Sequence, residues 1–183
     1  MSAAPDGFAY RDGLLTPEHE AGLLAAFRQL PFRPFEFHGF EGKRRVASFG
    51  ARYDYGTSRL VAAPKIPDFL LPLRAAAAAF AGIAPDSLRQ ALVTEYPAGA
   101  GIGWHRDRAE FGEVIGVSLA SCCRFLLRRQ SAGKRQRYAA MLEPRSAYVL
   151  RGAARSVWEH SIPPLGALRF SVTFRSMDRT EPG

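Results

Sequence analysis

The sequence predicts a mainly β fold with flanking helices, in a closed or double-sheeted architecture such as a jelly roll. Three observations support this prediction. The chain has 183 residues, of which 47% are hydrophobic and 23% charged, which suits one domain with a proper core. Helix signals belong to the first 88 residues. From residue 89 onward, short segments bounded by Gly, Pro or charged clusters follow one another, as in all-β proteins.

The first helix is predicted from its start and stop signals. Thr16 is a favourable cap, Pro17 suits the first helical position, and acidic residues follow in the first turn. An apolar stripe continues to Leu30, and Pro31 ends the helix. Residues 31–43 hold two prolines, four phenylalanines and two glycines, which predicts an irregular segment.

A strand, an aromatic loop and a second helix are predicted next. We expect the strand over residues 44–50 and a loop or hairpin with aromatic tips over 52–56. An alanine-rich helix is expected over 67–82, because alanine is the best helix former and Gly82 stops it. The strands expected after it are Gln90–Tyr96, Gly103–Asp107, Val114–Ala120, Cys123–Arg129, Arg137–Leu142, Ala147–Arg151 and Ala167–Ser176.

The charge of the chain is strongly positive. There are 25 Lys and Arg against 17 Asp and Glu, a net charge of +8, and most of the cations are arginine. Arginine makes fork-like contacts to phosphate and carboxylate, so the balance favours a nucleic-acid partner. The alternative is an arginine-rich coding preference without a partner. Residues 128–137 are expected to form a basic turn, either contacting phosphate or solvated.

Cysteine content and hydropathy bear on the compartment. The two cysteines, Cys122 and Cys123, are adjacent in an apolar run, which excludes a disulfide scaffold and favours a reducing compartment. The N-terminus has no basic segment followed by an apolar one, and no window reaches the ~18 apolar residues of a membrane-spanning helix. We therefore expect a cytoplasmic protein without a membrane partner, and a monomer.

A candidate metal site is defined by three residues. His105 and Asp107 are one residue apart, so on a strand both side chains point to the same face. His160 is a candidate third ligand. Two imidazoles and one carboxylate are the ligand set of non-haem iron(II) oxygenases. The alternative is a salt-bridged pair at the end of a surface strand. His19 and His38 lack a ligand pattern and are interpreted as surface or packing residues.

A pair of arginines lies on a predicted strand nine residues after His160. Arg169 and Arg175 share an alternating face with Ser171 and Thr173, and the opposite face is apolar. The arginine face is either a solvated outer surface or the lining of a barrel. Inside a barrel two guanidinium groups need an anion, because burying an unpaired charge is costly. Periodicity leaves both orientations open.

Together these motifs resemble a known family. The segments 94–107, 114–119, 150–160 and 169–175 resemble the AlkB family of iron(II)- and 2-oxoglutarate-dependent dioxygenases, over roughly residues 44–176. The resemblance implies a double-stranded β-helix (jelly roll) with an N-terminal helical and hairpin extension. It implies one dioxygenase domain over 1–183, with the extension in 1–88 and the catalytic core in 89–177.

The resemblance also implies the roles of the site residues. His105, Asp107 and His160 would ligate Fe(II). Arg169 would pair with the distal carboxylate of the cosubstrate 2-oxoglutarate, helped by the Tyr96 hydroxyl. Further candidates for cosubstrate binding are Arg175, near the carboxylate that chelates iron, and Thr94 and Ser171, where relatives often carry asparagine. The implied reaction consumes O2 and 2-oxoglutarate, hydroxylates an N-methyl carbon, and releases succinate, carbon dioxide and formaldehyde.

Residues 49–56 resemble the substrate lid of the family, which implies that they contact the substrate. The aromatic residues of the lid stack on a flipped base, a role open to Tyr53 or Tyr55. The alternative is that these tyrosines pack on the barrel rim. Relatives that repair bases often carry an acid two residues after the metal aspartate, whereas this chain has Ala109 there, followed by Glu110. The candidate substrate-binding residues are Phe49, Arg52, Tyr53, Tyr55 and Glu110.

The leading hypothesis is an oxidative demethylase of N-alkylated bases in DNA or RNA, in alkylation repair or RNA demethylation. The second is a dioxygenase of the same fold that hydroxylates or demethylates a protein or small molecule. The third is a binding module that has lost turnover, against which the intact metal triad argues. The basic charge and the tyrosines of the lid favour the first hypothesis over the second.

Overall fold

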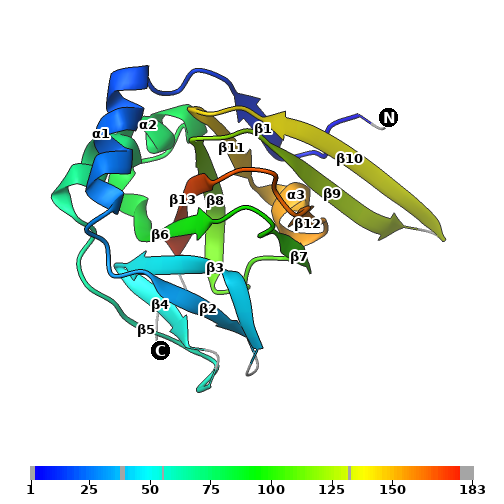
Figure 1. Cartoon of the computed structure of the whole chain (residues 1–183). Helices are drawn as coiled ribbons and strands as arrows, with labels where there is room; N and C mark the ends of the chain where they lie inside the picture. The colour runs from blue at the N-terminus through cyan, green and yellow to red at the C-terminus, as the bar shows by residue number, and fades with distance from the viewer. Residues whose placement is uncertain (1–2, 38–39, 55, 132, 178–183) are drawn as a thin grey trace.

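The strands of the chain form two face-to-face antiparallel sheets and a separate hairpin (Figure 1). The structure is a computed structural model that describes residues 3–37, 40–54, 56–131 and 133–177. Within these residues the larger sheet has the order β1-β11-β8-β13-β6-β3-β2. Its strands are β1 (Phe8–Arg11), β2 (Arg33–Phe37), β3 (Phe40–Phe49), β6 (Leu88–Tyr96), β8 (Phe111–Leu119), β11 (Ser146–Leu150) and β13 (Arg169–Met177).

The smaller sheet has the order β10-β9-β12-β7. Its strands are β7 (Ile102–His105), β9 (Cys123–Ser131), β10 (Lys134–Leu142) and β12 (Glu159–Ile162). A further hairpin consists of β4 (Ala51–Asp54) and β5 (Arg59–Ala62). The helices are α1 (Pro17–Phe27), α2 (Leu71–Ala81), the short α3 (Gly152–Ser156) and the 3-10 turns η1 (Asp68–Leu70) and η2 (Pro85–Ser87). The predicted mainly β class with flanking helices is confirmed.

Two hydrophobic cores lie on opposite faces of the larger sheet. One core is built by α1, α2 and the sheet face that carries Val172 and Phe174. The other fills the space between the two sheets and includes Tyr96, Phe125 and Tyr148. Figure 1 shows α1 and α2 on one side of the larger sheet, and the smaller sheet with α3 beside it on the other. Both faces of β13 are therefore buried, and the polar face, with Arg169, Ser171 and Thr173, points into the space between the sheets.

Both predicted helices are present, with small differences at their ends. The Thr16 hydroxyl accepts a hydrogen bond from the backbone N–H of His19 at 3.3 Å, as a helix cap does. The first helix ends at Phe27, earlier than Leu30. The second helix begins as a 3-10 turn at Asp68 and ends at Gly82, whose φ of 69° is the left-handed conformation that glycine adopts easily.

The expectation of an irregular segment over 31–43 is wrong. Residues 33–37 form β2 and residues 40–49 form β3, paired with a register shift between Pro34 and Phe35. β2 is the edge of the larger sheet, where proline is tolerated because one side of the strand needs no N–H partner. His38 lies outside the described residues. The N-terminal 88 residues thus contribute β1, β2 and β3 to the main sheet, besides the expected helices and hairpin.

The C-terminal strands also differ in detail from the prediction. Residues 128–137 are not a basic turn, because β9 extends to Ser131 and β10 starts at Lys134. The expected strand over 103–107 ends at His105. The short elements β1, α3 and β12 were not predicted. Among the described residues, no helix has the length and apolar character needed to cross a lipid bilayer.

Candidate metal centre

Three polar side chains meet between the two sheets, next to the larger sheet's polar face. His105 ends β7, His160 lies on β12, and the register places the two opposite each other. Their ring centroids are 4.2 Å apart. Asp107 Oδ2 lies 3.6 Å from His160 Nε2. The structure thus brings together the three residues that the sequence singles out as metal ligands.

Asp107 reaches this place by a route that the sequence reasoning missed. Because β7 ends at His105, the same-face rule for a strand does not position Asp107. Its carboxylate is instead held by Arg175, whose Nε and Nη2 donate to Oδ1 at 2.8 and 2.6 Å. The side chain of Asp107 is only 5% exposed, so this ion pair is shielded from water.

The Arg175 guanidinium continues into a hydrogen-bonded chain. Its Nη1 donates to the side-chain oxygen of Gln90 at 2.8 Å. The amide nitrogen of the buried Gln90 donates in turn to the backbone carbonyl of Ala51 at 3.0 Å, where the β4–β5 hairpin begins. Contacts therefore connect the Asp107 carboxylate to the base of this hairpin.

The protonation states suit metal binding. Burial lowers the pKa of His105 and lowers that of His160 to about 3, so both imidazoles are neutral. Burial alone would raise the pKa of Asp107, but the charge of Arg175 holds it well below its usual range. His105 Nδ1 lies 2.9 Å from the carbonyl of Gly103, a contact that fits an Nδ1–H donor and leaves the Nε2 lone pair available.

The loop after Asp107 is held by Arg155, another residue that sequence reasoning missed. Its guanidinium donates to backbone carbonyls of Asp107 at 3.1 Å, Phe111 at 2.7 Å and Gly112 at 2.9 Å, and also to that of Arg108. One side chain of α3 thus satisfies four carbonyls of a turn. No periodic pattern marks such a residue, because its partners are backbone atoms distant in sequence.

The polar face of β13 lines the space between the sheets, which settles the orientation that periodicity left open. Arg169 pairs in register with Tyr96, and Ser171 pairs with Thr94; all four are buried. Arg169 is 1% exposed, and its Nε donates to the Ser118 hydroxyl at 3.0 Å. Within the described residues its Nη1 has no hydrogen-bond partner. A buried guanidinium with a free N–H fits an anionic ligand.

Tyr148 was not among the predicted site residues. It comes from β11, is buried, and its ring centroid lies 4.5 Å from that of Phe125. Burial raises the pKa of Tyr148, so its hydroxyl keeps its proton. Gly116 on β8 makes room for it, because a Cβ at that glycine would overlap the Tyr148 ring. A glycine opposite a tyrosine in a paired strand is the signal that could have indicated this position.

The predicted substrate-binding residues are only partly brought together. Tyr53 on β4 is half-buried, and the Arg108 guanidinium lies 4.0 Å from its ring centroid and donates to its hydroxyl. Arg52 and Glu110 are exposed. Phe49 does not join them: it is buried in the core that α1, α2 and the larger sheet build, which indicates a packing role. Tyr55 lies outside the described residues.

The residue types of the cluster, two histidines and one aspartate, fit an iron(II) site. Two neutral imidazoles and a carboxylate are the ligands that such sites use. In the part of the chain that the structure describes, no three His, Cys, Asp or Glu side chains are arranged to hold a metal ion as they stand. Asp107 Oδ1 is engaged in the ion pair with Arg175, so Oδ2, on the side of His160, is the carboxylate oxygen that would be available to a metal.

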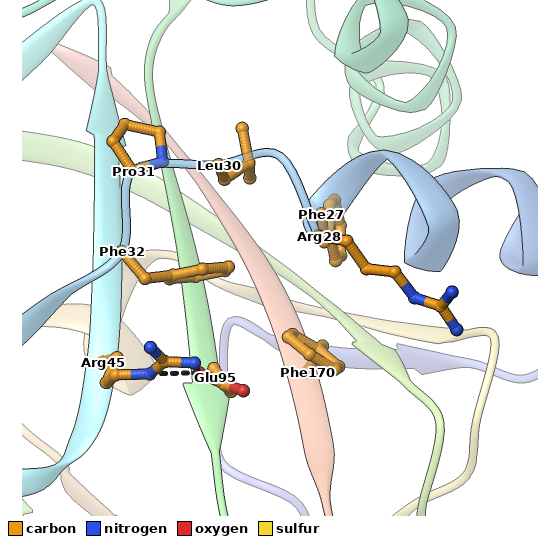
Figure 2. A pocket seen from close by; sticks show the side chains of 8 residues that line it. All are labelled: Phe27, Arg28, Leu30, Pro31, Phe32, Arg45, Glu95 and Phe170. Atoms are coloured by element: carbon orange, nitrogen blue, oxygen red, sulfur yellow. Dashed lines mark hydrogen bonds and ion pairs between the residues drawn. The ribbon is translucent and has the colours of Figure 1, made fainter.

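A cavity of about 360 Å³ lies elsewhere, between the end of α1 and the larger sheet. Figure 2 shows the ion pair of Arg45 and Glu95 in its floor, at 2.5 Å, beside the rings of Phe32 and Phe170. Glu95 and Phe170 are cross-strand partners that alternate with Tyr96 and Arg169. The cavity therefore opens on the sheet face opposite the metal centre.

Comparison with known proteins agrees with this geometry. Residues 9–175 match the family described as the 2OG-Fe(II) oxygenase superfamily. Over 145 residues the chain is 31% identical to the "Alkylated DNA repair protein ALKBH8 homolog" of Arabidopsis thaliana, covering 66% of this chain and 42% of that protein. Over 103 residues it is 32% identical to "Uncharacterized protein L905" of Acanthamoeba polyphaga mimivirus, covering 48% of each. The matches thus span less than half the length of these curated relatives.

A solved structure shares the fold. The structure titled "The structure of OsALKBH1" superposes with a TM-score of 0.75 at 17% identity, covering 96% of this chain and 99% of that one. At this identity the likeness concerns the fold. It confirms the predicted double-stranded β-helix.

Proposed function

The chain belongs to the 2OG-Fe(II) oxygenase superfamily and is AlkB-like, and we propose that it is an oxidative demethylase of N-alkylated bases in DNA or RNA. The family implies Fe(II) and 2-oxoglutarate as cofactor and cosubstrate. The observation that carries the proposal is the buried Arg169, which shares the inward-facing polar side of β13 with Arg175, the residue that holds Asp107. An arginine with an unpaired N–H on the strand face that also holds the carboxylate of the His105, Asp107 and His160 cluster suits a metal and a dicarboxylate together.

In this proposal the side chains hold and orient, and the bound groups supply the oxidation. His105, His160 and Asp107 hold the metal, and Arg175 keeps the Asp107 carboxylate ionised and aimed at it. Bound iron(II) with 2-oxoglutarate and O2 supplies the hydroxylation of an N-methyl carbon, which is then lost as formaldehyde.

Cosubstrate binding falls to the buried polar face of β13 and its partner β6. Arg169 takes the distal carboxylate of 2-oxoglutarate, and Tyr96, whose ring centroid is 5.1 Å from the Arg169 guanidinium, adds its hydroxyl. Thr94 and Ser171 complete this lining. The surrounding core keeps water away, which strengthens each charge-assisted contact.

Three observations support a nucleic-acid substrate. The net charge is +8. The half-buried Tyr53 lies on a hairpin beside the loop that carries Asp107, where a flipped base needs a stacking surface. The Arabidopsis relative carries the name of an alkylated DNA repair protein.

The test is turnover of 2-oxoglutarate with iron(II), measured together with formaldehyde release. Oligonucleotides bearing N-methylated bases, as DNA and as RNA, are compared with their unmethylated counterparts and with the His105→Ala variant. We expect formaldehyde from a methylated oligonucleotide with the native chain alone. Turnover of 2-oxoglutarate that no methylated oligonucleotide stimulates would reject the nucleic-acid substrate and leave a protein or small-molecule oxygenase.

A further inference from the structure

The outer face of the smaller sheet carries a row of arginines. Along β9, Cys123, Phe125 and Leu127 are buried, so the alternate residues Arg124 and Arg128 point outward. Register extends this face onto β10: Arg137 is opposite Arg128, and Arg135 is opposite Gln130. The arginine face is defined by Arg124, Arg128, Arg135 and Arg137.

The charges on the arginine face are poorly compensated. Arg128 and Arg137 are direct cross-strand neighbours, a like-charge pair that destabilises a sheet. Arg128 is neutralised by Glu159 of β12, with Nε 2.8 Å from the carboxylate. Arg124, Arg135 and Arg137 are exposed, and among the described residues no carboxylate pairs with any of them. The face therefore presents three uncompensated cations to solvent.

An aromatic residue borders the arginine face on the side of the metal centre. Trp104 lies on β7 next to the inward-pointing His105 and is 36% exposed. The Arg128 guanidinium lies 4.3 Å from the centroid of its ring. The face thus ends at the strand whose other side supplies a metal-ligand candidate.

The dimensions of the face favour an extended polyanion over a single headgroup. Arg124 and Arg128 are four residues apart, about 13 Å along the strand, and neighbouring strands are about 4.8 Å apart. Forked guanidinium groups spread over such an area suit a series of phosphates. In Figure 1 the β9–β10 hairpin extends on the side of the molecule away from α1 and α2, so neither helix covers it.

We propose that the arginine face is a docking surface for the phosphate backbone of a nucleic-acid strand. The proposal rests on the proposed function, because it supplies the backbone contacts of the same substrate. The strand crosses β10, β9 and β12 and reaches the edge strand β7, beyond which its target base enters the site between the sheets. Arg124, Arg135 and Arg137 make the contacts, and Arg128 is held by Glu159 and Trp104.

The experiment compares two variants that each lower the net charge by three. One is the triple variant Arg124→Gln, Arg135→Gln and Arg137→Gln. The matched control is Arg11→Gln, Arg28→Gln and Arg89→Gln, three exposed arginines on other elements. The probe is a fluorescent single-stranded thymidine oligonucleotide without methylated bases, titrated by anisotropy at several salt concentrations, without iron or 2-oxoglutarate.

The slope of log affinity against log salt is the readout. Each neutralised phosphate of a single strand contributes about 0.7 to this slope, so the arginine-face variant should lose about 2. The control variant should keep the native slope. Replacing the same three arginines with lysine should largely restore it, which shows that charge, and not a folding defect, is measured.

Several outcomes would overturn the proposal. Equal slopes for the arginine-face variant and the control would do so, and so would no oligonucleotide binding by the native chain at low salt. Binding to anionic phosphatidylglycerol vesicles in place of the oligonucleotide would assign the face to a lipid surface instead. The binding assay needs no turnover, so the two proposals can fail separately. If the arginine-face variant loses the salt dependence while the native chain demethylates no oligonucleotide, the docking surface is upheld and the enzymatic proposal is rejected.

Discussion

Two nitrogens of Arg175 donate to a single oxygen of Asp107: Nε lies 2.8 Å and Nη2 lies 2.6 Å from Oδ1. This leaves Oδ2 toward His160, 3.6 Å away. Arg175, the second arginine of the pair on β13, thus orients the carboxylate of the candidate metal ligand Asp107. Outer groups of this kind orient a ligand and tune its affinity.

We expect Arg175→Met to weaken metal binding by about 10–100-fold, because Asp107 loses the charge that orients it and keeps it ionised. Manganese(II) titration followed by thermal unfolding measures this. Arg11→Gln, an exposed arginine on β1, is the control and should bind as the native chain does. Unchanged metal affinity in Arg175→Met would mean that the ion pair has no part in the site.

Removing any one of the three predicted ligands should abolish the stabilisation by metal. The ligands come from β7, the loop after it and β12, so the site exists only in the folded chain, and metal binding raises its melting temperature by mass action. His105→Ala, Asp107→Ala and His160→Ala should each show circular dichroism like that of the native chain but no shift with manganese(II). A native-sized shift in any of them would remove that residue from the ligand set.

Arg169→Gln should raise the 2-oxoglutarate concentration needed for half-saturation. Losing a charge-assisted contact in a dry pocket costs about 2–5 kcal/mol, which is at least tenfold in affinity. Binding of 2-oxoglutarate to the manganese(II) form, measured by calorimetry, gives the value directly. Arg33→Gln on the outer edge strand should leave that value as it is. Equal affinities would place the cosubstrate carboxylate elsewhere.

Arg155→Lys should loosen the turn between Asp107 and Gly112, because an ammonium cannot serve four separate carbonyls. Hydrogen exchange of the amides in this turn should accelerate, and metal affinity should fall with it. Arg106→Gln is the control, since within the described part of the chain that guanidinium donates to one carbonyl, that of Ser156 at 3.3 Å. Native exchange rates in Arg155→Lys would show that the turn holds its shape by itself.

Gly116→Ala should destabilise the fold by about 1–3 kcal/mol, because the added methyl group overlaps the ring of the buried Tyr148. Urea unfolding measures the free energy. Gly22→Ala is the matched control: nothing lies within 4 Å of its new Cβ, and in α1 alanine should stabilise by about 0.5–1 kcal/mol. A neutral Gly116→Ala would mean that the Tyr148 ring shifts freely.

Much of the fold was predictable where the signal is local. Caps, alanine content and alternation placed α1, α2 and most strands after residue 88. β1 and β12 have four residues each, too few for a periodic signal, and each exists because it pairs with a strand distant in sequence. The prolines and glycines of 31–43 suggested a loop, whereas Pro34 lies in the edge strand β2 and Gly42 lies in β3, its partner.

The residues of the candidate site also divide into those that the sequence could predict and those that it could not. His105, Asp107 and His160 were predictable because chemistry singles out their residue types, and the structure places them together. The direction in which Arg169 points was not predictable, because alternation defines two faces without saying which one is covered. Arg155 and Gln90 act through backbone carbonyls and a neighbouring guanidinium, so no motif marks them. Phe49, expected at the substrate, is buried because its side chain lies on the sheet face that packs into the core shared with α1 and α2.

The contacts from Asp107 through Arg175 and Gln90 to the Ala51 carbonyl have a thermodynamic consequence. The Gln90 amide accepts a hydrogen bond from Arg175 and donates one to the Ala51 carbonyl, so a movement of Arg175 or of Ala51 disturbs both hydrogen bonds. Any coupling free energy carried by this chain is reciprocal. If binding of a metal or cosubstrate near Arg175 changes the affinity for a substrate at the β4–β5 hairpin, the substrate must change the affinity for that metal or cosubstrate by the same factor.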